Sequence, residues 1–274
     1  MPTNPKLGQN FLRDSQAVER IVAALGDISG RTVIEIGPGE GVITRALAAR
    51  AKHVIAVELD HDLAVHLRVQ FPSEKVTIVE QDILSFDFAA KLAEHGSSGE
   101  RLRVVGNLPY YITSPILLKL AANQTALDLA VLMVQREVAD RVTAQPGSRN
   151  YGVLSVTTQV YGPVASMFTL PPEAFSPPPD VHSTVFRWRF ASRFAELDIQ
   201  ESTFLRFVRM AFAQKRKTLA NNLRAAGYAP AEITAALNEA GIAPQARAET
   251  LSVDSFAALA KVFATSDART SSAQ

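Results

Sequence analysis

Residues 31–41 read Arg-Thr-Val-Ile-Glu-Ile-Gly-Pro-Gly-Glu-Gly, an apolar run that passes directly into a glycine-rich turn. We predict a strand over 31–36 and a helix over 41–51, because glycines allow a sharp turn and the close approach of a ligand to the backbone. The spacing is Gly-x-Gly-x-Gly. It does not match the dinucleotide fingerprint Gly-x-Gly-x-x-Gly, because Val42 occupies the last position of that pattern.

Two further predicted strands lead into acidic residues. Glu58 closes the strand His53–Glu58, 21 residues after Gly37, and Asp82 follows the strand Val76–Glu80. Glu58 could accept hydrogen bonds from both hydroxyls of a ribose, and Asp82 could accept one from an adenine amine. Either acid could instead cap the helix or loop that follows it. Three successive strands that end in this way favour a cofactor site.

The first two-thirds of the chain alternate strands with helices. Further strands are predicted over 103–106 and 127–134, and helices over 60–71, 114–122 and 135–144. The strands are nearly continuous apolar runs, which is typical of a parallel sheet covered on both faces. Two later strands, over 154–161 and 181–190, are predicted to form an antiparallel pair at one sheet edge.

The pattern changes to helices alone after about residue 191, over 203–213, 231–240 and 255–264. We therefore predict an α/β domain over residues 1–191 and a small all-helical domain over 192–274. The tail after about residue 265 is rich in Ser, Ala and Thr, and we expect it to be disordered.

Composition narrows the class of protein. The chain has no cysteine, which excludes disulfides, thiolate catalysis and cysteine-ligated zinc. Without a signal-peptide pattern or an apolar run of roughly 20 residues, we expect a soluble cytoplasmic protein. Residues 1–184 carry 16 basic and 19 acidic side chains, and residues 185–274 carry 12 and 8. A basic C-terminal part fits a polyanionic partner, although many solvated helical surfaces are as basic.

The tetrapeptide Asn107-Leu108-Pro109-Tyr110 directly follows a predicted strand. The amide oxygen of Asn107 and the carbonyl of Leu108 could each accept a hydrogen bond from the exocyclic amine of a base. Pro109 stiffens the turn, and Tyr110 could stack on the base. Alone, the tetrapeptide could also be an ordinary turn, since Asn and Pro are common there.

Four motifs occur in a characteristic order: Gly8-Gln9-Asn10-Phe11-Leu12, Glu35-Ile36-Gly37-Pro38-Gly39, the tetrapeptide, and Phe175-Ser176-Pro177-Pro178-Pro179. Through them the chain resembles the ribosomal RNA adenine N6-dimethyltransferases, over about residues 5–262. The resemblance implies the class I methyltransferase fold, a Rossmann-like, mostly parallel sheet of seven strands. It also implies S-adenosylmethionine as cofactor, S-adenosylhomocysteine as product, and no metal.

Residues 211–223 are similar to the C-terminal domain of the small-subunit enzyme of this family. That resemblance implies N6,N6-dimethylation of two adjacent adenines near the 3′ end of 16S RNA. The partner would be an immature small ribosomal subunit, and we expect a monomer.

The resemblance also assigns roles to residues. Cofactor contacts carry over to Asn10, Leu12, Gly37, Gly39, Glu58, Asp82 and Asn107. Contacts with the target base carry over to Asn107, Leu108, Pro109 and Tyr110, with Phe175 as a second stacking ring. A core position is the alternative for Phe175, since large aromatic rings are usually buried. Relatives usually have Lys-Val-Asp-Ser where this chain has Asp180-Val181-His182-Ser183, which puts local RNA contacts in doubt.

A basic run, Lys215-Arg216-Lys217, follows Arg206 and Arg209. We expect these five side chains to form a basic helix face that meets RNA phosphates, which would make binding salt-dependent. An ordinary solvated helix face is the alternative.

The implied reaction is an in-line attack of the adenine amine on the methyl group, without a general base. Asn107 and the Leu108 carbonyl would localise the nitrogen lone pair and stabilise the developing positive charge. Three other functions fit parts of the pattern. They are a large-subunit methyltransferase of the antibiotic-resistance type, a non-catalytic RNA-binding assembly factor, and a nicotinamide-dependent dehydrogenase.

Overall fold

The computed structural model describes residues 10–95 and 100–271, with side chains as far as residue 264. The chain divides into two compact units. The first contains Met1–Ala139 and Pro163–Ala191, and the second contains Asp140–Gly162 and Ser192–Gln274. A break after residue 191 coincides with the predicted boundary. The segment Asp140–Gly162 differs from the prediction, because it groups with the C-terminal part of the chain.

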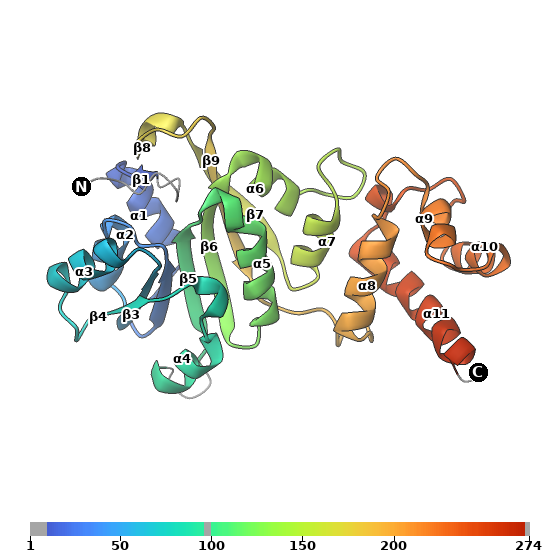
Figure 1. The fold of residues 1–274 in the computed structure, drawn as a ribbon, viewed down its shortest axis with the longest axis horizontal. Helices are drawn as coiled ribbons and strands as arrows, with labels where there is room; N and C mark the ends of the chain where they lie inside the picture. Colours follow the sequence, from blue (N-terminus) through green and yellow to red (C-terminus); the bar gives the residue numbers. More distant parts are fainter. Residues whose placement is uncertain (1–9, 96–99, 272–274) are drawn as a thin grey trace. The chain divides into compact units, whose positions relative to one another are not determined.

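A seven-stranded sheet forms the centre of the first unit (Figure 1). Its strands lie in the order β4-β3-β2-β5-β6-β9-β7. Neighbours among β4, β3, β2, β5 and β6 are parallel, whereas β9 is antiparallel to both β6 and β7. This confirms the predicted mostly parallel sheet. The bounds are β2 Thr32–Ile36, β3 His53–Glu58, β4 Val76–Glu80, β5 Leu102–Asn107, β6 Leu127–Gln135, β7 Val164–Leu170 and β9 Ser183–Arg189.

Helices cover the sheet because each carries an apolar stripe. Residues of α1 (Ser15–Ala24), α2 (Val42–Ala48) and α3 (His61–Gln70) pack with the sheet in one apolar cluster that includes Val33, Val54 and Val105. The next residue of β2, Ile34, is also fully buried and points to the opposite face, because side chains alternate along a strand. Figure 1 shows α5 (Thr113–Ala122) in front of β5 and β6; α4 (Phe88–His95) precedes β5 in the chain.

Residues 154–161 are not the predicted strand. They belong mainly to helix α7, Val153–Gln159, and the second antiparallel strand is β7, which the sequence prediction missed. Thr157 and Thr158 each donate a side-chain hydrogen bond to the carbonyl four residues earlier, at 2.7 Å. These bonds satisfy the hydroxyls inside a helix, so the β-branched composition of the segment does not decide its structure.

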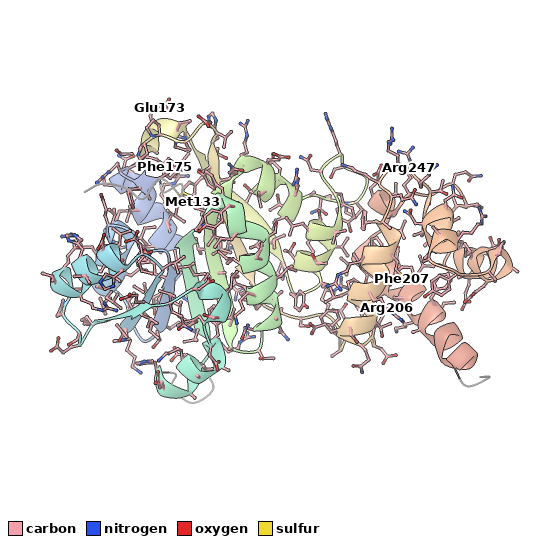
Figure 2. All side chains as sticks on the ribbon, viewed as in Figure 1. Met133, Glu173, Phe175, Arg206, Phe207 and Arg247 are labelled. Carbon is pink, nitrogen blue, oxygen red and sulfur yellow. The ribbon has the colours of Figure 1, made fainter. Side chains whose placement is uncertain are left out.

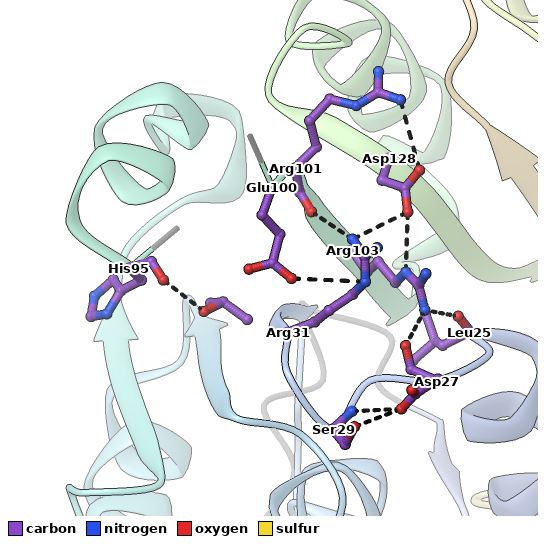
Figure 3. A network of polar contacts seen from close by, with 10 residues as sticks. Leu25, Asp27, Ser29, Arg31, His95, Glu100, Arg101, Arg103 and Asp128 are labelled. Atoms are coloured by element: carbon purple, nitrogen blue, oxygen red, sulfur yellow. Dashed lines mark hydrogen bonds and ion pairs between the residues drawn. The ribbon is translucent and has the colours of Figure 1, made fainter. Parts of the chain in front are cut away.

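The amino-terminal end of the sheet is tied down by a polar network around Arg103 (Figure 3). The Arg103 guanidinium donates to the carbonyls of Leu25 and Asp27, just after α1, and its Nε lies 3.2 Å from Asp128 Oδ2. Arg31 also pairs with Asp128, at 3.5 Å. This network holds the end of the sheet opposite the glycine-rich turn, so it serves the fold.

The second unit is helical in its described residues. It contains α7, α8 (Glu201–Ala211), α9 (Leu219–Ala225), α10 (Pro230–Glu239) and α11 (Val253–Ser271), while α6 (Arg136–Val142) runs across the division. Phe207 stacks on Phe263 with ring centroids 5.7 Å apart, and both rings are buried. Helix α11 continues beyond residue 265, where the sequence predicted a disordered tail; residues 272–274 lie outside the described residues. Within the described part of the chain, no helix has the length and apolar character needed to cross a bilayer.

Candidate active site

An open cavity lies where β2, β3 and β5 end and β4 passes into its loop. Ligands of open α/β sheets bind at this edge, because glycine-rich turns and polar strand ends meet there. Ten of the predicted site residues line the cavity: Asn10, Leu12, Gly37, Gly39, Glu58, Asp82, Asn107, Leu108, Pro109 and Tyr110. The predicted cofactor and base contacts, Phe175 excepted, therefore share one space.

The glycine-rich turn closes against the N-terminal segment. Gly39 has a φ of +58°, and a Cβ there would lie 2.9 Å from two carbon atoms of the Phe11 ring. Only glycine combines this backbone conformation with such a close aromatic contact. An ion pair of 2.8 Å between Arg13 and Glu40 joins the same two segments.

Glu58 is 5% exposed, and each of its carboxylate oxygens accepts a backbone hydrogen bond. Oε2 accepts from the amide of Gly39 at 3.1 Å, and Oε1 accepts from the amide of Asp60 at 2.9 Å. Burial raises the pKa of Glu58 above its ordinary value. The carboxylate thus shapes the glycine turn and, because each oxygen has further acceptor capacity, can still accept from ribose hydroxyls.

Asp82 is exposed and caps the short 3₁₀ helix η2, Ile83–Ser85. Its Oδ1 accepts from the amide of Leu84 at 2.9 Å. Asp82 therefore does cap the element that follows it, which was the alternative prediction from the sequence. Asp82 also lines the cavity, so the two roles are compatible.

A second acid, Glu35, lies almost fully buried at the cavity, with 1% of its surface exposed. Burial raises the pKa of Glu35 to about 8, and the nearby Glu58 adds to the rise, although the hydroxyl of Thr44 donates to Glu35 Oε2 at 2.6 Å and opposes it. Glu35 is therefore mostly protonated at neutral pH, which avoids a second buried negative charge beside Glu58.

The Asn107 amide is oriented by the N-terminal segment. Its Nδ2 donates to the backbone carbonyl of Asn10 at 3.0 Å. Among the described residues, neither Asn107 Oδ1 nor the carbonyl of Leu108 has a hydrogen-bond partner, while the Leu108 amide is held by Met133 at 2.9 Å. Two acceptors at the cavity are thus available to an exocyclic amine.

Tyr110 is held at its hydroxyl. Its Oη lies 3.0 Å from Oγ of Ser183, the fully buried first residue of β9. Burial raises the pKa of Tyr110, so the phenol stays protonated at physiological pH. The hydroxyl contact fixes the ring at the cavity wall, where it can stack on a planar group.

Phe175 is not among the cavity-lining residues. It is 4% exposed and belongs to the apolar cluster of the first unit, and it pairs with Leu12 where the short strands β1 (Phe11–Leu12) and β8 (Phe175–Ser176) meet (Figure 2). The core position, which was the alternative prediction, describes this structure. A ring buried among apolar side chains offers no face to a base.

The predicted basic helix face is also corrected. Lys215, Arg216 and Lys217 are exposed, but they lie in the turn between α8 and α9. Arg206 and Arg209 are exposed on α8 itself. The turn is shaped by Asn222, whose Nδ2 donates to the carbonyls of Ala211 at 2.6 Å and Gln214 at 3.3 Å.

Several cavity residues escaped the sequence prediction. They are mainly apolar or aromatic and lie within a predicted motif or next to a predicted site residue: Phe11, Leu59, Gln81, Ile83, Tyr111 and Ile112. Their adjacency to the motifs was the only available signal.

The cavity fits S-adenosylmethionine. Gly37, Gly39 and Gly41 all have positive φ, which lets the turn approach a ligand closely. Glu58 offers acceptors for a ribose diol, and Asp82 offers one for an adenine amine. These acceptors therefore match the nucleoside part of S-adenosylmethionine.

Comparison with known proteins identifies the family. A family model for ribosomal RNA adenine dimethylases matches residues 2–265. The ribosomal RNA small subunit methyltransferase A of Acidobacterium capsulatum is 57% identical over 256 residues, which cover 93% of this chain and 89% of that protein. The enzyme of the same name from Desulfitobacterium hafniense is 43% identical over 254 residues, covering 92% and 89%.

Two solved structures share the fold. A dimethyladenosine transferase from Plasmodium falciparum superposes with a TM-score of 0.79 at 22% identity, covering 93% of this chain and 98% of that one. The 23S rRNA methyltransferase ErmE superposes with a TM-score of 0.71 at 26% identity, covering 92% and 99%. The chain belongs to the ribosomal RNA adenine dimethylase family.

Proposed function

We propose that this chain uses S-adenosylmethionine to dimethylate N6 of two adjacent adenines near the 3′ end of 16S ribosomal RNA. The observation that carries the proposal is the single cavity that joins Glu58 and the glycine turn to the free acceptors of Asn107 and Leu108. The two small-subunit methyltransferases A described above support the choice of RNA.

The residues at the cofactor end of the cavity (Glu58, Asp82 and the glycine turn) and those at the base end (Asn107, Leu108 and Tyr110) have distinct roles. Glu58, Asp82 and the glycine turn would hold the cofactor, together with Asn10 and Leu12. Bound there, S-adenosylmethionine supplies an electrophilic methyl group. Asn107 Oδ1 and the Leu108 carbonyl accept hydrogen bonds from N6 of the adenine, which favours a pyramidal nitrogen with a localised lone pair. The same oxygens stabilise the positive charge that develops on that nitrogen.

Tyr110 holds the plane of the flipped adenine by stacking, an interaction of roughly 1–3 kcal/mol for a base on an aromatic ring. Pro109, at φ −58°, keeps the turn between the acceptors and the ring rigid. Solvent takes the proton from the methylated nitrogen. Orientation of the two reactants supplies much of the remaining rate enhancement.

The basic turn at Lys215–Lys217 supports a contact with RNA phosphates in the second unit, with Arg206 and Arg209 on α8 as further candidates. Such contacts set the register of the RNA and weaken as salt is raised. We propose that the substrate is an immature small subunit, and that the enzyme acts on it as a cytoplasmic monomer.

Methyl transfer from tritiated S-adenosylmethionine tests the proposal. Immature small subunits and large subunits are offered separately to the wild type, Asn107→Ala and the matched control Asn150→Ala, whose side chain is exposed in the second unit. We expect label on two small-subunit adenines with the wild type and the control, and at least ~100-fold less with Asn107→Ala, because preorganised acceptors of this kind contribute roughly 10²–10³ in rate.

Titration with S-adenosylhomocysteine shows whether Asn107→Ala is still folded and competent to bind. Label on large subunits would contradict the choice of RNA and favour the alternative prediction, a large-subunit methyltransferase of the antibiotic-resistance type. An absence of label with the wild type, while it still binds the particle, would favour an assembly factor.

A further inference from the structure

Tyr111 carries an exposed aromatic ring at the mouth of the cavity. Its side chain is 58% exposed, and it is one of the cavity-lining residues. Of the large apolar side chains that are exposed in the described residues, only Tyr111 and Leu59 line the cavity. Leu59 adjoins Glu58, at the end assigned to the cofactor, whereas Tyr111 adjoins the tetrapeptide that faces the base.

The ring stands on a rigid turn. Residues Tyr110–Ile112 form the 3₁₀ helix η3, and the carbonyl of Pro109 accepts from the amide of Ile112 at 3.2 Å and from the hydroxyl of Thr113 at 3.0 Å. Successive side chains of a 3₁₀ helix point about 120° apart. Since Tyr110 is fixed by Ser183, Tyr111 points in a different direction from the ring assigned to the target adenine.

Within the part of the chain that the structure describes, no polar or aromatic contact holds the exposed side chain of Tyr111. Within residues 10–95 and 100–271, its hydroxyl makes no hydrogen bond and its ring belongs to no aromatic pair. The ring therefore contributes little to the fold, and its exposed apolar surface suits a ligand outside the cavity.

We propose that Tyr111 is a stacking platform for the unpaired nucleotide next to the target adenine. This inference rests on the proposed function. A flipped adenine leaves the face of its former neighbour without a stacking partner, and unstacking costs a few kcal/mol. An aromatic ring at the mouth of the cavity replaces that lost contact. The ligand class is a single-stranded nucleotide with any base, since every base has a face that can stack.

Steady-state kinetics with immature small subunits test the role of the ring. The variants are Tyr111→Ala, Tyr111→Phe, which keeps the ring, and Leu118→Ala, an exposed residue of α5 that does not line the cavity. We expect Tyr111→Ala to raise KM for the particle about 5- to 30-fold, the lower part of the range for a stacked base, with kcat and affinity for S-adenosylhomocysteine nearly unchanged. Tyr111→Phe and Leu118→Ala should both resemble the wild type.

A second measurement reports stacking directly. A short single-stranded RNA carries 2-aminopurine beside the target adenine, and its fluorescence should be quenched on binding to the wild type and Tyr111→Phe but not to Tyr111→Ala. An unchanged KM for Tyr111→Ala overturns the inference, as does an equal loss of cofactor affinity, which would assign the ring to the cofactor. Failure of the proposed function is distinguishable, because the wild type itself would then transfer no methyl group.

Discussion

Replacing Gly39 by alanine tests the link between the glycine turn and the acceptor site. The new Cβ meets two obstacles. Gly39 has a φ of +58°, and the Phe11 ring lies 2.9 Å from the position of the new atom. The ring must move, and Phe11 directly follows Asn10, whose carbonyl orients the Asn107 amide. We therefore expect the substitution to disturb both the cofactor end of the cavity, at the glycine turn, and the base end, at Asn107.

The expected loss in the free energy of unfolding follows from the two obstacles. The left-handed conformation costs about 1–2 kcal/mol for a residue with a Cβ. Displacing a packed ring adds about 1–3 kcal/mol. A total of about 2–5 kcal/mol is a large fraction of the stability of a typical domain, yet it leaves most molecules folded. Because the Glu58 bond to the Gly39 amide is disturbed too, affinity for S-adenosylhomocysteine should fall at least ~10-fold.

Gly147→Ala is the matched control. Gly147 also has a positive φ, +84°, but a Cβ at this position would meet no atom within 4 Å beyond its chain neighbours, and the residue belongs to the second unit. The variant should lose only about 1–2 kcal/mol of stability and keep wild-type affinity. Urea unfolding measures stability, and calorimetric titration with S-adenosylhomocysteine measures affinity. The reasoning is refuted if Gly39→Ala binds as tightly as the wild type, or if the two variants lose affinity equally.

Three further outcomes are expected. Ser183→Ala frees the Tyr110 hydroxyl and should lower methyl transfer several-fold, by about 1 kcal/mol, with unchanged affinity for S-adenosylhomocysteine in calorimetry. Asn222→Ala removes hydrogen bonds to two carbonyls around the basic turn and should destabilise the protein by about 1–3 kcal/mol in urea unfolding. Glu35 has a raised pKa, so its contribution to stability is fully present below 4.5 and is lost as pH rises through about 8. Thermal melts across this range should show a smaller decline for Glu35→Gln than for the wild type.

The central parallel strands of the sheet were predictable because they are buried on both faces. Such strands read as nearly continuous apolar runs, as in residues 33–36 with only Glu35 as a polar residue, and their ends carry the polar site residues. Glu58 and Asn107 could therefore be assigned to one edge of the sheet from sequence alone. The structure confirms that edge, since both line the same cavity.

The antiparallel edge was harder to predict for a physical reason. Strand β7 is largely exposed and alternates weakly, so it lacks the apolar signal of a buried strand. The helix α7 has the β-branched composition typical of strands, but Thr157 and Thr158 satisfy their hydroxyls within the helix. Residue composition was therefore a poor guide to the structure of both segments.

The motif around Phe175 did not predict that its side chain is buried. The motif shows an aromatic ring before a run of prolines, which suits a base-binding loop and a core position equally. The difference is decided by the pairing of Leu12 with Phe175, a contact between segments far apart in the sequence. Tyr111, in contrast, is exposed although no residue pattern distinguished it from Tyr110.

The orientation of the Asn107 amide bears on which base the cavity accepts. A side-chain amide has a donor NH₂ group and an acceptor oxygen, and either one could face the cavity. Here the NH₂ group of Asn107 donates to the Asn10 carbonyl, so the oxygen remains for a ligand. The cavity is left with two acceptors, Asn107 Oδ1 and the Leu108 carbonyl. If the base binds as proposed, an exocyclic amine satisfies both, whereas a base with a carbonyl at that position would set oxygen against oxygen and leave all of them unpaired. Unpaired acceptors discriminate against such a base, so the N-terminal segment contributes to selection of a base with an exocyclic amine, without touching that base.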